Sequence, residues 1–113
     1  MTGVAAGHRR MTPELLALVA SRFRALGEPA RLRLLQELLP GERTVTELVA
    51  LTDFGQANVS KHLQVLHAAG LVMRHRDGPF VCYGIADDRV YALCDIMCDQ
   101  LRAGSRTLQE IVG

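Results

Sequence analysis

One segment of the chain, residues 56–76 (QANVSKHLQVLHAAGLVMRHR), limits the possible folds more than any other. Apolar residues recur in it at helical spacing as far as Gly70, and an alternating strand pattern follows. Glycine favours the end of a helix because it adopts a positive φ without a steric penalty. The segment therefore predicts a helix over residues 56–69, a tight turn at Gly70 and the first strand of a hairpin over residues 71–76.

The formal charges in this segment have one sign. No Asp or Glu lies between Phe54 and Arg76, although the chain contains 12 acidic residues, and Lys61, Arg74 and Arg76 all fall within the segment. The net charge of the whole chain is only +1, which by itself does not indicate a nucleic-acid partner. A locally basic surface does, because it attracts phosphate even where the total charge is small.

Three helix starts precede the segment. Thr12 offers a hydroxyl cap before Pro13, and Glu28-Pro29 opens a second helix, since proline favours the first position of a helix. Thr44 and Glu47 match a capping box, in which two side chains satisfy the free amides of a helix start. In the second helix we expect a broad apolar face made by Leu32, Leu35 and Leu39, with Leu34 and Leu38 beside them.

A second strand and a last helix follow the segment. Asp77-Gly78, between the alternating runs 71–76 and 80–85, predicts a β-hairpin. Helical spacing returns from Asp87 onward. The sequence thus predicts a mainly α chain with a β-hairpin wing, in the order α-α-α-α-β-β-α. This winged helix-turn-helix domain covers residues 12–110 and follows a flexible N-terminus at residues 1–11.

Composition excludes several other classes. A chain of 113 residues has the size of one domain with one core. It contains no apolar run long enough to span a membrane, and its N-terminus lacks the apolar stretch of a secretory signal, so we expect a cytoplasmic protein. Its three cysteines are an odd number, which favours free thiols, ligands or redox switches over a disulfide framework. Neither Cys-x-x-Cys nor a cysteine in a Gly-rich phosphate loop occurs, so we expect no thiol enzyme.

Three motifs, taken together in this order, resemble the ArsR/SmtB family of bacterial repressors. They are residues 26–32 (LGEPARL), residues 59–63 (VSKHL) and residues 70–72 (GLV), which lead into a wing ending at residues 83–85 (YGI). The resemblance covers residues 12–110. It implies a homodimeric winged helix-turn-helix repressor that binds double-stranded operator DNA and is not an enzyme.

The predicted recognition helix has a polar outer face that could read DNA. The major groove admits an α-helix, where amides can read adenine, a methyl group can meet thymine, and Lys or Ser can bind phosphate or guanine. On the wing, Arg74 and Arg76 share one face of a strand, with His75 on the other. His62 lies between the buried and exposed faces of the helix, where we expect a structural hydrogen bond. The candidate DNA-binding residues are Gln56, Ala57, Asn58, Ser60, Lys61, Gln64, Arg74 and Arg76.

The last helix carries two cysteines, Cys94 and Cys98, on one face. Residues four apart on a helix have Cβ atoms about 5–6 Å apart, whereas a disulfide needs about 3.5–4.5 Å. Two thiolates on one tetrahedral metal lie roughly 3.8 Å apart, which converging rotamers can reach. The pair therefore suits a soft thiophilic ion better than a disulfide. The alternative is ordinary packing, since free cysteine is often buried.

Cys82, in the second wing strand and on the opposite face from Tyr83 and Ile85, is a candidate third ligand.

Departures from the family pattern narrow the choice of effector site. Arsenic-type members resemble one another in a Cys-x-Cys in the third helix, and residues 47–51 (ELVAL) contain no cysteine. Zinc- and cobalt-type members carry Asp-x-His and a later histidine pair, whereas residues 87–89 read DDR and no histidine follows. Sulfide-sensing members use a cysteine in the second helix, and residues 30–39 contain none.

What the family resemblance leaves is a variant site built on Cys94 and Cys98. We expect no constitutive cofactor, and release from the operator when these thiols bind an inducer: As(III) as arsenite, Sb(III) as antimonite, or a soft divalent metal. Two alternatives stay open. One is a thiol-redox or reactive-sulfur sensor with the same DNA-binding mode, and the other is a repressor with no effector.

Overall fold

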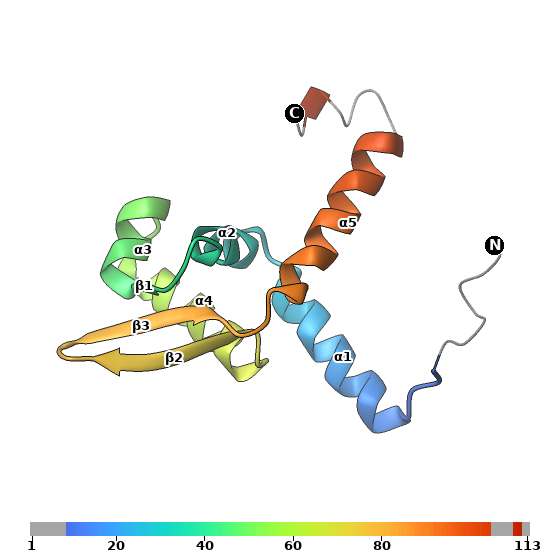
Figure 1. Ribbon diagram of the computed structural model, residues 1–113, viewed down its shortest axis with the longest axis horizontal. Coiled ribbons are helices and arrows are strands. Elements are labelled where there is room, and N and C mark those ends of the chain that lie inside the picture. The colour runs from blue at the N-terminus through green and yellow to red at the C-terminus, as the bar shows by residue number, and fades with distance from the viewer. Residues whose placement is uncertain (1–8, 105–109, 112–113) are drawn as a thin grey trace.

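The computed structural model describes residues 9–104 and 110–111 of the chain. Most of the predicted flexible N-terminus, and residues 105–109 near the end of the predicted domain, lie outside these residues. In Figure 1 the middle helices gather beside a protruding hairpin, while the first and last helices diverge on the opposite side. The elements are α1 (Pro13–Leu26), α2 (Pro29–Leu38), β1 (Arg43–Thr44), α3 (Val45–Thr52), α4 (Gln56–Ala68), β2 (Val72–Asp77), β3 (Phe80–Ile85) and α5 (Arg89–Gly104).

The three predicted helix starts are confirmed. The Thr12 hydroxyl accepts a hydrogen bond from the Leu15 amide at 3.1 Å, and the Glu28 carboxylate accepts one within the first turn of α2. At α3 the capping box is complete. The Glu47 amide donates to the Thr44 hydroxyl at 3.1 Å, and the Thr44 amide donates to the Glu47 carboxylate at 2.8 Å. These bonds from Thr44 hold the pKa of Glu47 below its usual value.

The predicted end of the recognition helix at Gly70 is also confirmed. Gly70 has a φ of 77°, its amide donates to the carbonyl of His67 at 3.0 Å, and the Leu71 amide donates to the carbonyl of Leu66 at 2.9 Å. This pair of bonds is the Schellman arrangement that satisfies the last carbonyls of a helix. It turns the chain directly from α4 into β2, and so fixes the wing close to the recognition helix.

The sheet has one strand more than the sequence predicted. Its three antiparallel strands lie in the order β1-β3-β2, so β3 is central. The two-residue strand β1 places Arg43 opposite Tyr83 and Thr44 opposite Cys82. The predicted order α-α-α-α-β-β-α therefore gains a strand between α2 and α3. Two residues are too few to show the alternation of apolar and polar side chains that predicts a strand. This strand forms only because β3 offers it a free edge.

The core lies where α2, α3 and α4 meet the base of the sheet. Only part of the predicted apolar face is buried: Leu32 and Leu39, the residue that caps α2, are 36% and 45% exposed. The helix packs against α1, α3 and α4 along a different line. This line runs through Leu34, Leu35 and Leu38, which are at most 2% exposed. The fully buried side chains across the core are Leu34, Leu35, Leu38, Leu48, Val59, Leu63, Leu66 and Leu71.

Candidate nucleic-acid interface and thiol site

Helix α4 presents two contrasting faces. Its inner face is fixed by Val59, Leu63 and Leu66, none of which is exposed to solvent. This packing sets the rotation of the helix about its axis. The burial of the apolar side chains therefore determines which side chains face outward. The structure brings the six predicted DNA-reading residues of this helix to that outer side. Gln56, Ala57, Asn58, Lys61 and Gln64 are exposed, and Ser60 is half-buried at the edge.

The wing carries the other two predicted residues. Arg74 lies opposite Tyr83 and Arg76 opposite Val81, so the two arginines share one face of the sheet, as the alternation predicted. Both are exposed. His75 is on the other face, and its Nε2 lies 3.4 Å from a carboxylate oxygen of Glu42. In the part of the chain that the structure describes, no carboxylate forms an ion pair with either arginine or with Lys61.

His62 makes the structural hydrogen bond that its position predicted, but its partner was not foreseen. The Nη1 group of Arg31 lies 3.3 Å from the Nδ1 atom of His62. The same guanidinium donates from Nε to the Ala25 carbonyl at 2.6 Å and from Nη2 to the Arg24 carbonyl at 3.2 Å. Arg31 thus joins the end of α1 to the recognition helix. Its place in the LGEPARL motif was the only sequence signal, and that signal did not indicate a contact 31 residues away.

Both thiols of the candidate effector site lie on one side of α5. Only Val90, Tyr91, Cys94 and Cys98 are half-buried in this helix, and its other residues are exposed. Both cysteines are free. Burial, then the nearby charges of Asp95 and Cys98, raises the pKa of the Cys94 thiol. Burial and the neighbouring thiols, Cys94 foremost, likewise raise the pKa of Tyr91. The phenol and the two thiols therefore share one small region of the helix.

The third cysteine occupies a different environment. Cys82 lies in the central strand β3 and is 8% exposed. The register puts it on the opposite face from Tyr83, as predicted, and across from His75 and Thr44. Burial, followed by the charges of Asp77 and Glu42, raises the pKa of its thiol. Among the described residues no three His, Cys, Asp or Glu side chains come together as a metal-binding group.

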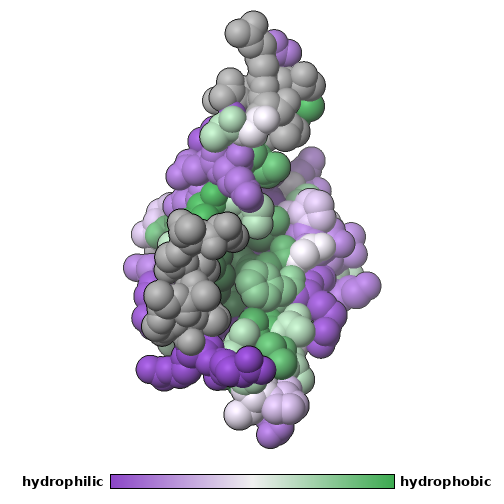
Figure 2. Space-filling view, turned by 90° about the vertical axis from the view of Figure 1, so that its right-hand side faces the viewer, coloured by the Kyte–Doolittle hydropathy of each residue, from purple (hydrophilic) through white to green (hydrophobic). Residues whose placement is uncertain are grey.

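Helices α1 and α5 form an apolar face outside the core. Figure 2 shows apolar side chains gathered around a hollow on this side of the molecule. Leu18 and Phe23 of α1 are 64% and 58% exposed, and Ile96 of α5 is 66% exposed. No residue of α5 is fully buried. The large exposed apolar residues of the two helices are Leu15, Leu16, Leu18, Phe23, Leu93, Ile96, Met97 and Leu101.

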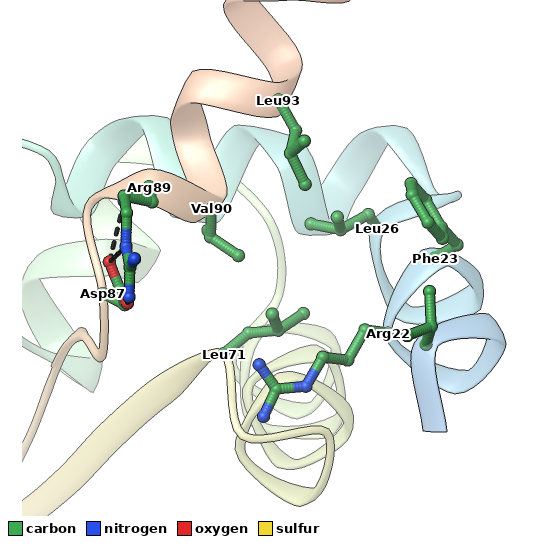
Figure 3. Close-up of a pocket in the computed structure, with 9 residues that line it drawn as sticks. Arg22, Phe23, Leu26, Leu71, Asp87, Arg89, Val90 and Leu93 are labelled. Atoms are coloured by element: carbon green, nitrogen blue, oxygen red, sulfur yellow. Dashed lines mark hydrogen bonds and ion pairs between the residues drawn. The ribbon is translucent and has the colours of Figure 1, made fainter. Parts of the chain in front are cut away.

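The hollow is a cavity of about 360 Å³ between the two helices. Figure 3 shows Asp87 and Arg89 paired on one side of it, and Arg22 extending from α1 on the other. The Arg22 guanidinium covers Gly70, where a Cβ would lie 2.8 Å from it. Hydrogen bonds from Arg89 hold the pKa of Asp87 at about 2, so this carboxylate is charged at neutral pH.

None of the described helices is both long enough and apolar enough to cross a membrane.

Comparison with known proteins agrees with this geometry. The model of the bacterial regulatory protein arsR family matches residues 28–74, from the start of α2 into β2. The probable mercury resistance operon repressor of Streptomyces lividans is 47% identical over 68 residues, which are 60% of this chain and 54% of that protein. The match therefore spans about half the length of that relative.

Two further relatives match over more of the chain. A transcriptional repressor SmtB homolog from Synechocystis sp. is 34% identical over 99 residues, covering 83% of this chain and 75% of that protein. The homodimeric winged helix-turn-helix DNA-binding domain of a possible ArsR-family regulator from Mycobacterium bovis has a TM-score of 0.72. It is 31% identical, and the match covers 82% of this chain and 92% of that one. Fold and relatives are those of DNA-binding repressors and not of enzymes. The chain belongs to the ArsR/SmtB family of winged helix-turn-helix transcriptional repressors.

Proposed function

We propose that this repressor binds double-stranded operator DNA as a homodimer, with α4 in the major groove and the wing on the backbone. The support is the acid-free segment 55–76, in which Lys61, Arg74 and Arg76 are all exposed. Dimerisation is supported by the apolar face of α1 and α5 and by the homodimeric relative from Mycobacterium bovis. Covering such a face with a second copy removes apolar area from water.

We further propose that a soft thiophilic ion bound by Cys94 and Cys98 releases the operator. One observation carries this proposal: two free thiols lie together on the half-buried side of a helix that has no fully buried residue. The similarity to a mercury resistance operon repressor supports the class of inducer, which comprises mercury(II), cadmium, lead, arsenite and antimonite. Cys82 is proposed only as an accessory ligand, because it is buried in the sheet.

Release follows from linkage between the two binding events. An ion that binds more tightly to the DNA-free dimer must weaken DNA binding by the same free energy, typically about 1–3 kcal/mol. Helix α5 is suited to transmit this effect, because its exposed apolar face would pack against the second protomer. A small shift of α5 would then change the distance between the two recognition helices, and with it the fit to both half-sites.

The test is a band-shift titration of operator complexes with each of these ions. We expect Cys94→Ser and Cys98→Ser each to leave DNA binding intact and to abolish release. Cys82→Ser is the matched control and should have a smaller effect. Wild-type release by both helix variants would show that the cysteines serve only in packing.

The same titration with peroxide and polysulfide examines the redox alternative. Release by these oxidants and by none of the ions would replace the metal proposal. A protein that none of the reagents releases would be a repressor without a thiol effector.

A further inference from the structure

We infer that Arg31 is a positioning residue that couples α1 to the recognition helix through His62, and so sets the geometry with which the dimer reads its operator. The inference rests on the proposed function, in which α1 belongs to the dimer interface and α4 reads DNA. It assigns a role in specificity to two side chains that need not touch DNA.

The guanidinium of Arg31 is held by partners on two different helices. On α1 it binds the carbonyls of Arg24 and Ala25, which lie in the last turn. The Arg24 carbonyl also accepts from the Gly27 amide at 3.2 Å. A positive charge beside the carbonyls of a last helical turn is favourable. On α4 it binds Nδ1 of His62 at 3.3 Å. One rigid planar group thus fixes the distance between the end of α1 and the middle of the recognition helix.

The direction of the hydrogen bond to His62 determines the tautomer of the imidazole. Arginine is always protonated in proteins and can only donate. Nδ1 of His62 must therefore accept, and the ring proton must lie on Nε2. This tautomer is a consequence of the link that can be measured without any DNA.

The end of α1 packs into the core beside α4 through Ala25 and Leu26, but a gap lies next to the Arg31 link. A cavity of about 320 Å³ lies beside the link, and its lining includes the small residues Ser21, Ala25, Ala68 and Ala69. Small side chains make few contacts across a gap, so they restrain the angle between two helices weakly. The second observed contact is Arg22 against Gly70, at the far end of α4. The core packing of α4 sets its rotation, and the directional bonds of Arg31 add a restraint between α1 and α4 near the reading surface.

Loss of this restraint should affect specific binding more than any other property. The two recognition helices of a dimer must match half-sites at a fixed spacing. A small rotation of α4 against α1 disturbs that match, whereas contacts to phosphate tolerate it and the dimer interface does not involve it. We therefore expect about a tenfold loss of operator affinity, the size of one charge-assisted hydrogen bond, with unchanged binding to unrelated DNA.

The experiment measures the DNA affinity of His62→Leu, His62→Asn and Arg31→Lys. Two duplexes are used: one that the wild-type protein selects from a random pool, which serves as the operator, and one of unrelated sequence. Asn is the conservative variant, because its side-chain oxygen stands where Nδ1 stands and can accept from Arg31. We expect His62→Leu and Arg31→Lys to lose about tenfold in operator affinity and His62→Asn to recover most of it, although Asn is the poorer helix former. The double variant His62→Leu/Arg31→Lys should be no worse than either single one.

His67→Leu is the matched control, since His67 is exposed on the same helix and should leave affinity unchanged. Sedimentation should show dimers for all variants. Operator affinity of His62→Leu equal to wild type, or a loss for His62→Asn equal to that for His62→Leu, overturns the inference. Nitrogen NMR of the wild-type protein gives an answer even if a variant fails to fold, because a proton on Nδ1 of His62 would also overturn it. Failure of the proposed function is distinct: the wild-type protein would then select no duplex at all.

Discussion

Lys61 shows how much of DNA binding can depend on one residue. It is the single lysine of the chain, it is exposed on the outer face of α4, and no carboxylate pairs with it among the residues that the structure describes. We expect Lys61→Glu to abolish operator binding while the dimer stays folded, because the variant places a carboxylate against phosphate. Lys61→Gln should flatten the dependence of log affinity on log salt by about one.

The measurement for Lys61 is a band shift over a range of salt concentrations. Arg10→Glu, which makes the same change of net charge in front of α1, is the control and should retain binding. Because the chain has one lysine, operator DNA should also protect a single side chain from an amine-reactive reagent. Retained affinity of Lys61→Glu at moderate salt would contradict the assignment of α4 as the recognition helix.

The protonation of Cys94 gives a second prediction at the residue scale. Its pKa is raised above the usual value for a thiol, so the side chain is protonated at neutral pH. A soft divalent ion such as cadmium binds the thiolate and releases this proton, so its apparent affinity should rise with pH, about tenfold per unit for each proton displaced. Arsenite and antimonite carry hydroxide that takes up the thiol proton as water, so for them the profile should be flat, and the test uses cadmium. The measurement is the ion concentration at which half of the operator DNA is released, taken between about pH 6 and pH 8. It is corrected for the pH dependence of DNA binding without the ion. A flat profile for cadmium would mean that no thiol proton is displaced.

At the scale of the element, the wing acts as a unit because Arg74 and Arg76 share one face of β2. We expect Arg74→Ala and Arg76→Ala to weaken binding to all DNA sequences by similar factors, since contacts to the backbone position the protein without reading bases. Each substitution should lower the slope of log affinity against log salt by about one. Arg102→Ala on α5 removes the same charge away from the wing and should leave the slope unchanged. Sequence-dependent losses would instead indicate that the wing reads bases.

For the molecule as a whole, the apolar face of α1 and α5 predicts a symmetric dimer that reads a pseudo-palindrome. Ile96 is 66% exposed on this face, so Ile96→Glu should yield a monomer by burying a charge at the interface. Operator affinity should then fall by about a hundredfold or more, because two linked half-sites no longer act together. Sedimentation at micromolar concentration is the measurement. Leu39→Glu, an exposed leucine outside both helices, should remain dimeric. A wild-type monomer would refute the dimer.

Signals that act within a few residues determined most of the elements. The caps at Thr12 and Thr44, the glycine at the end of α4 and the two strand patterns each depend on local backbone chemistry, and each predicted an element that the structure contains. The outward side of α4 was predictable for the same reason. Helical spacing alone separates Val59, Leu63 and Leu66 from the polar side chains.

Contacts between distant segments were decided only by the tertiary structure. Strand β1 forms because β3 offers an edge, and the burial of Cys82 depends on what covers its face of the sheet. Which leucines of α2 face inward depends on how that helix lies against its neighbours. The bond from Arg31 to His62 joins residues that no local pattern relates. Local propensity acts over one turn of helix or one pair of strands, whereas these features depend on how finished elements meet in space, and the order of residues along the chain does not encode that directly.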